Sequence, residues 1–187
     1  MRVFSSDGVE LMKSLVFAVC LLLSVPTIGH ATQDDPGVSE TDIDFETARL
    51  SRNVTAVRIS EEIVLDGLLD EPVWDLADPA TDFIQRTPRN GEPAGDRTEA
   101  RFLYDDENLY VGVLAFDSNA ENMVMTLVED FSFSQFDVIT VVLDTLNDDR
   151  SAFNFQANPG GARRDGQIKN DAQSVNFDWD GLWYLET

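Results

Sequence analysis

Short apolar runs separated by turn-forming residues make up most of the chain from about residue 54 onward, and this feature constrains the fold most strongly. The runs recur at intervals of roughly ten residues, which is typical of an all-β sandwich or barrel. We expect strands at residues 54–63, 98–104, 109–116, 138–143, 151–157 and 182–185.

Four of these runs carry signs of their pairing or orientation. The acidic segment 105–108 separates the runs 98–104 and 109–116, which predicts a hairpin with a four-residue turn. In 151–157, Phe153 and Phe155 alternate with polar residues, so this strand has one apolar and one polar face. The nearly continuous β-branched run 138–143 predicts a strand that is covered on both faces.

The remaining capping and turn-forming residues predict one short helix and several turns. An acid at the cap and Pro72 in the first turn favour a short helix over 70–77. Gly67 is suited to a turn that needs a positive φ, and segment 158–161 (NPGG) predicts a turn or bulge. Apolar neighbours predict that Trp74 lies in the core, where we expect it to plug one end of the sandwich.

The first 31 residues resemble a secretory signal peptide. The apolar run 15–23 follows Lys13 and Ser14 and is shorter than the roughly 20 residues of a spanning helix. Gly29 and Ala31 provide small residues where a signal peptidase cuts. We therefore expect export through the inner membrane and cleavage after Ala31, with a membrane anchor as the alternative.

Cleavage would remove the only Cys and the only His of the chain, Cys20 and His30. The remaining chain cannot form a Ser-His-Asp or Cys-His nucleophile. It also cannot form a disulfide or a zinc site of the Cys/His type.

The chain is strongly acidic, with 35 Asp and Glu against 13 Lys and Arg and a net charge of −22. The predicted signal peptide contains two residues of each sign, so cleavage leaves the net charge unchanged. Such a chain repels nucleic acid and anionic lipid. Neutral sugars, cations and basic protein surfaces remain as partners, and solubility alone is an equally good reason for the charge.

Three domain-level segments follow from composition and pattern. Residues 1–31 form the signal peptide, 32–53 a flexible acidic leader without sustained periodicity, and 54–187 a single β-sandwich domain. The run 182–185 is followed at once by the chain end, so we expect its hairpin partner in a longer protein. The sandwich is therefore predicted to be incomplete in this chain.

Three segments, in order, resemble the family 9 carbohydrate-binding modules: 63–74 (IVLDGLLDEPVW), 104–112 (YDDENLYVG) and 137–144 (DVITVVLD). The stretch 143–166 is more similar to a branch that precedes a predicted outer-membrane β-barrel in bacterial proteins. The resemblance covers most of the chain after the leader. It implies an all-β, jelly-roll-like sandwich of antiparallel strands, carbohydrate binding, and a location in the periplasm, outer membrane or cell surface.

The resemblance also implies where a sugar would bind. Family members hold a sugar ring between aromatic side chains, with charged groups on its hydroxyls. Aligned through the 137–144 segment, the first stacking Trp falls on Ser134, the acid on Thr140 and the Arg on Gln156, so all three differ. The second stacking Trp would lie beyond Thr187.

Nearby residues are candidates to replace these groups. The segment 131–136 (FSFSQF) brings three Phe residues into a polar loop. Our candidate sugar-binding residues are Phe131, Phe133, Gln156 and Asn158. The alternative is that two of the Phe rings pack beneath the loop as core, while the amides simply face water.

No cofactor is required by the sequence, but calcium is an option because related modules carry structural calcium. The hard oxygen donors that Ca²⁺ prefers are concentrated after the run 138–143. The candidate ligands are Asp144, Asn147, Asp148 and Asp149.

Three functions remain open. The first is a non-catalytic, exported carbohydrate-binding domain that is associated with polysaccharide catabolism. The second is a structural or docking domain for an attached outer-membrane barrel, without sugar binding. The third is part of a glycoside hydrolase, whose two carboxylates must lie about 5 to 10 Å apart; no pair is singled out by the sequence, so any such activity would come from an attached domain.

Overall fold

The computed structural model describes residues 2–4, 52–118, 123–132 and 136–187. The expected signal peptide and leader lie outside this part, apart from Arg2–Phe4 and the last two leader residues. The described chain forms two β-sheets and one short helix, so the predicted all-β fold is confirmed. The elements are β1 (Arg2–Phe4), β2 (Val57–Arg58), η1 (Pro72–Leu76), β3 (Thr98–Tyr104), β4 (Asn108–Ala115), β5 (Ile139–Leu143), β6 (Ala152–Ala157), β7 (Arg163–Lys169), β8 (Ser174–Asn176) and β9 (Trp183–Tyr184).

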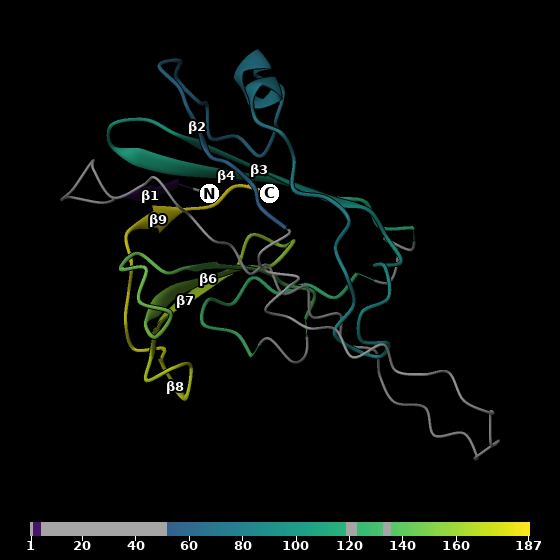
Figure 1. The fold of residues 1–187 in the computed structure, drawn as a ribbon, viewed down its shortest axis with the longest axis vertical. Coiled ribbons are helices and arrows are strands. Elements are labelled where there is room, and N and C mark those ends of the chain that lie inside the picture. The colour runs from purple at the N-terminus through teal and green to yellow at the C-terminus, as the bar shows by residue number, and fades with distance from the viewer. Residues whose placement is uncertain (1, 5–51, 119–122, 133–135) are drawn as a thin grey trace.

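The two sheets pack face to face as a sandwich (Figure 1). One sheet has the order β2-β3-β4-β1-β9, and the other has the order β5-β6-β7-β8. The second sheet is antiparallel throughout. In the first sheet β2 pairs with β3 in parallel, which corrects the expectation of antiparallel strands only.

The β3–β4 hairpin confirms the prediction from the two flanking runs. Its register pairs Tyr104 with Leu109. Asp105 stabilises the turn because its carboxylate accepts the backbone N–H groups of Glu107 and Asn108, at 2.8 and 2.7 Å. Such Asx-type bonds are a common reason for Asp at turns.

The main core lies between the two sheets. Phe102 and Val111 of the first sheet contact the inward side chains of the second, of which Phe155 is 3% exposed. Trp183 on β9 belongs to the same cluster. The alternation that was read in 151–157 is therefore confirmed: Phe155 points into the sandwich, and its polar neighbours point away from it.

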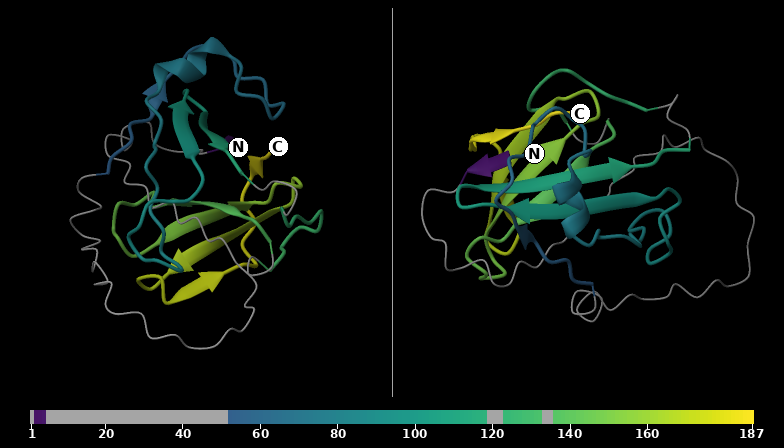
Figure 2. Two further views of the ribbon diagram at one scale, coloured as in Figure 1. Left: turned by 90° about the vertical axis from the view of Figure 1, so that its right-hand side faces the viewer. Right: turned by 90° about the horizontal axis from the view of Figure 1, so that it is seen from above.

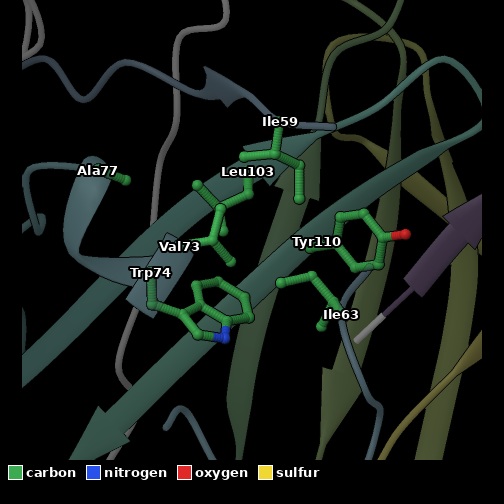
Figure 3. Close-up of a cluster of buried hydrophobic side chains, with 7 residues drawn as sticks. All are labelled: Ile59, Ile63, Val73, Trp74, Ala77, Leu103 and Tyr110. Atoms are coloured by element: carbon green, nitrogen blue, oxygen red, sulfur yellow. The ribbon is translucent and has the colours of Figure 1, made fainter. Parts of the chain in front are cut away.

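A second buried cluster covers the opposite face of the β3–β4 pair (Figure 3). Leu103 and Tyr110 alternate with the inward residues of their strands and contact Trp74 and Val73 of η1. Both views in Figure 2 place η1 on the outer side of the first sheet. Trp74 is thus buried, as predicted, but it lies on the outer face of this sheet rather than at the end of the sandwich.

The segment before this helix is less regular than its sequence suggested. Only Val57–Arg58 of the expected strand 54–63 pairs in a sheet. Ile59 and Ile63 are buried against Trp74 instead of forming a ladder. The helix is a 3-10 helix of five residues, which is the usual form of so short a turn.

β1 is an interior strand of its sheet, between β4 and β9. It runs antiparallel to both neighbours, so these two strands run parallel to each other. Cleavage after Ala31, as predicted, would take β1 out of this sheet and leave a slot for an antiparallel strand.

The close contact between η1 and the sheet leads to a first prediction. A Cβ atom at Gly112 would lie 2.8 Å from the Trp74 ring and 3.0 Å from Leu69. We expect Gly112→Ala to displace the helix and lower the free energy of unfolding by roughly 1 to 3 kcal/mol, as overpacking usually does. Gly95→Ala is the matched control, because a Cβ there has no heavy atom within 4 Å. Equal denaturation midpoints for the two variants would contradict the packing of Trp74 against Gly112.

Candidate functional site

The outer face of the β5–β8 sheet carries an unusual set of polar side chains. Asn154 and Gln156 point outward from β6, because Phe153 and Phe155 of the same strand point into the sandwich. Both amides are nevertheless buried, at 6% and 7% exposed. The cross-strand neighbours of both amides follow from the strand register.

The strand register brings three outward side chains into one row. Thr140 of β5 lies opposite Gln156, and Gln156 lies opposite Arg164 of β7. Asn154 lies in the next row, opposite Gly166. Polar groups from three strands therefore meet on one face.

Three buried polar atoms of this face have no hydrogen-bond partner in the described structure: Asn154 Oδ1, Gln156 Oε1 and Arg164 Nε. The Gln156 amide makes one long bond, from Nε2 to the Thr140 hydroxyl at 3.5 Å. Leaving such a group unsatisfied costs about 1 to 3 kcal/mol. Two acceptors and one donor on the same face are thus buried without a partner among the described residues.

An aromatic ring completes this face. Phe177, which follows β8, is half-buried, and the Arg164 guanidinium carbon lies 3.5 Å from the centre of its ring. Gly166 leaves the space for the ring, since a Cβ there would lie 2.9 Å from Phe177 Cδ1. Below, "the outer-face site" means Thr140, Asn154, Gln156, Arg164 and Phe177.

The positive charge of Arg164 is only partly compensated by a nearby negative charge. Burial lowers the pKa of Arg164 from its usual value, and the nearby Asp130 carboxylate acts in the opposite direction. Arginine stays protonated in proteins. The lowered pKa therefore expresses a desolvated positive charge that an anion would stabilise.

Of the predicted sugar-binding residues, only Gln156 belongs to the outer-face site. Phe131 is 4% exposed and packs with Val138, Ala162 and Phe136, whose ring meets it edge to face at 5.9 Å. It presents no ring face to solvent. Phe133 lies outside the described residues.

Asn158 is 1% exposed, and its amide is used within the protein. Its Oδ1 accepts the N–H groups of Thr126 and Gly160, at 3.0 and 2.8 Å. Its Nδ2 donates to the carbonyls of Asp137 and Val124, at 3.0 and 3.5 Å. Asn158 thus joins three loop segments and does not point to a ligand.

The predicted calcium ligands lie in one loop, between β5 and β6. Asp144 accepts the backbone N–H groups of Leu146, Asp148 and Asp149. Asn147 and Asp149 both have positive φ angles, of 51° and 55°. Across the described residues no three His, Cys, Asp or Glu side chains come together in a metal-binding group.

Asp148 in this loop is also held by local hydrogen bonds. The N–H groups of Ser151 and Arg150 and the Ser151 hydroxyl lower its pKa, and desolvation opposes them. The carboxylates of Asp144 and Asp148 thus organise the loop backbone in the structure.

The other shifted carboxyl groups also favour the ionised form. Burial alone would raise the pKa of Asp105, but hydrogen bonds from Glu107, Tyr110 and Asn108 outweigh it, so the pKa is lowered. Hydrogen bonds from backbone N–H groups lower the pKa of Glu61. A glycosidase general acid needs a raised pKa, and these groups do not supply one.

Arg164 and Phe177 were not anticipated from the sequence. The segment 163–169 (RRDGQIK) lacks apolar alternation, so it gave no strand signal. A weaker signal was present. Two arginines, Arg163 and Arg164, are adjacent in a very acidic chain, and Gly166 comes shortly after them.

No protein-family model matches this chain, and no curated protein or solved structure is detectably similar to it. The resemblance to family 9 modules is therefore carried by the sequence segments alone. Within the described parts of the chain, no helix has the length and apolar character needed to cross a membrane.

Proposed function

We propose that this protein is an exported, non-catalytic carbohydrate-binding domain whose ligand sits on the outer-face site. The observation that carries the proposal is the set of three buried hydrogen-bonding atoms without a partner on one sheet face. A sugar hydroxyl is both donor and acceptor, so hydroxyls can satisfy the Asn154 and Gln156 oxygens and the Arg164 Nε–H group. A ligand that binds these three atoms removes the free-energy cost of leaving their hydrogen bonds unmade.

Phe177 gives the site an apolar surface as well. The CH face of a pyranose packs against an aromatic ring, while polar groups at its rim bind the hydroxyls. Thr140 and Gln156, on which the family resemblance places ligand-binding groups, lie opposite each other at this site. The proposed location is the periplasm or cell surface, and the proposed context is polysaccharide breakdown by other proteins.

The test is a glycan array followed by calorimetric titration of the best oligosaccharide, with Phe177→Ala as the variant. We expect this change to weaken binding about fivefold, since stacking on an aromatic ring is worth on the order of 1 kcal/mol. Phe116→Ala is the control, because Phe116 is an exposed ring directly after β4 of the other sheet, and the Arg97 guanidinium carbon lies 5.1 Å from its ring centre. An equal loss of affinity in both variants, or an unchanged affinity of the Phe177→Ala variant, would contradict the assignment of the site.

One observation favours docking as a second function. Leu127 and Val128 are 82% and 69% exposed, in a mostly apolar stretch that begins at Val124. Exposed apolar stretches of this kind often mark interaction surfaces. A folded chain that binds no glycan on the array would favour docking to an attached domain over sugar binding.

A further inference from the structure

The outer face of the β5–β8 sheet differs from the rest of the protein in its charge. The strand register defines which described strand residues point outward. They are Thr140, Val142, Ala152, Asn154, Gln156, Arg164, Gly166, Ile168 and Val175. Arg164 is the only ionisable residue among them, although the chain as a whole carries a net charge of −22. These outward residues of the described strands therefore combine one positive charge with no carboxylate.

Arg164 also differs from most of the other described arginines. Salt bridges to Asp or Glu occupy Arg58, Arg89, Arg97, Arg101, Arg150 and Arg163. The Arg164 side chain has neither a salt bridge nor a hydrogen bond within the described chain, and its Nε is buried. Asp130 acts on it only at longer range.

The stacking of Arg164 on Phe177 determines which groups of the guanidinium remain for hydrogen bonds. A guanidinium that lies against a ring uses its flat face for the ring and keeps its N–H groups in its own plane. Those N–H groups form a fork that matches the two oxygens of a carboxylate. The contact with Phe177 thus leaves the N–H groups of Arg164 for an anion, since the described chain gives them no hydrogen-bond partner.

We infer that the ligand is an acidic sugar, in which a uronic acid carboxylate pairs with Arg164 while neighbouring hydroxyls bind Asn154 and Gln156. The inference rests on the proposed function and adds the chemical class of the ligand. The two amide oxygens require hydroxyl donors beside the anion, and a uronic acid supplies both on one ring. A densely charged polyanion is disfavoured because the protein's own net charge repels it.

The test compares acidic oligosaccharides with neutral ones of the same size. The probes are trigalacturonate and a glucuronate-substituted xylooligosaccharide, each with its carboxyl-reduced counterpart, titrated into the full chain at low salt. We expect the acidic form of at least one pair to bind about tenfold tighter or more, because a charge-assisted fork is roughly twice as strong as neutral hydrogen bonds. The Arg164 Nε–H resonance should shift on binding.

Three variants separate the charge from its geometry. Arg164→Gln should abolish the preference for the acidic form, and Arg164→Lys should keep only part of it, since lysine lacks the fork. Arg89→Gln removes an equal charge from an exposed salt bridge with Glu92 and should leave the preference intact. All variants are checked for an unchanged circular dichroism spectrum.

The outcomes distinguish the two proposals. Binding of neutral forms as tightly as acidic ones, with no effect of Arg164→Gln on the ratio, overturns the acidic ligand and leaves sugar binding in place. Absence of any binding by the folded chain overturns both. Loss of the acidic preference in Arg89→Gln as well would show that net charge, not Arg164, sets it.

Discussion

Replacement of Trp183 by alanine is expected to lower the free energy of unfolding by about 4 kcal/mol, within the range for buried aromatic residues. Trp183 is 2% exposed and belongs to the cluster between the two sheets. Its ring meets Phe155 edge to face, with 5.5 Å between the ring centres. The cavity left by alanine would lie at the centre of this contact.

Part of that loss comes from a buried carboxylate. Asp165 is 6% exposed and accepts the indole Nε1–H of Trp183 at 2.9 Å and the N–H of Gly181 at 2.8 Å. Alanine at position 183 removes one of these two donors. Trp183→Phe, which keeps a ring but not the N–H group, should therefore cost roughly 2 kcal/mol through the weakened stabilisation of Asp165.

Denaturant unfolding followed by circular dichroism measures both effects. Leu182→Ala is the control, since the neighbouring Leu182 is 63% exposed and should change stability little. A loss below about 1 kcal/mol for Trp183→Ala would contradict the placement of this ring in the inter-sheet core.

The sequence predicted best those strands whose sides differ in polarity. The hairpin of β3 and β4 follows from two apolar runs around an acidic turn, and β6 follows from Phe153 and Phe155 in alternation. In β6 the side-chain directions follow the local pattern, although Asn154 and Gln156 on its polar face are buried as well. The turn at 158–161 was also predicted, and Gly161 has a φ of 85° there.

The strands β7 and β8 could not be predicted because their inward residues are polar. Asp165 takes an inward position, where Trp183 and Gly181 satisfy it. Arg163 donates to the Trp183 carbonyl at 2.7 Å and pairs with Glu129. Such positions break the apolar alternation on which strand prediction depends, and their partners are remote in sequence.

The outer-face site was only partly predictable for the same reason. Gln156 was a candidate from its place on the polar face of its strand. Arg164 becomes its neighbour only through the β6–β7 register, and Phe177 meets Arg164 only because the chain turns back through β8. Cross-strand relations of this kind are invisible until the strands themselves are known.

Asn158 was a candidate ligand from its sequence, whereas its surroundings assign it to the fold. Its amide bridges Thr126, Gly160 and Asp137, which lie on three separate segments. The residue is almost fully buried. A substitution there tests whether the local structure at this end of β6 depends on one side chain.

We expect Asn158→Ala to lower the free energy of unfolding by about 3 kcal/mol, because it leaves two N–H groups and one carbonyl without partners in a buried place. Asn158→Asp should cost less, since a carboxylate still accepts the N–H groups of Thr126 and Gly160 but no longer donates to Asp137. Asn176→Ala is the control: Asn176 is exposed and accepts only the Asp178 N–H group, at 3.2 Å. Urea unfolding measures the stability, and titration with oligosaccharide measures the affinity. If Asn158→Ala kept full stability but lost sugar binding, Asn158 would be a ligand residue and the structural role argued for it would be refuted.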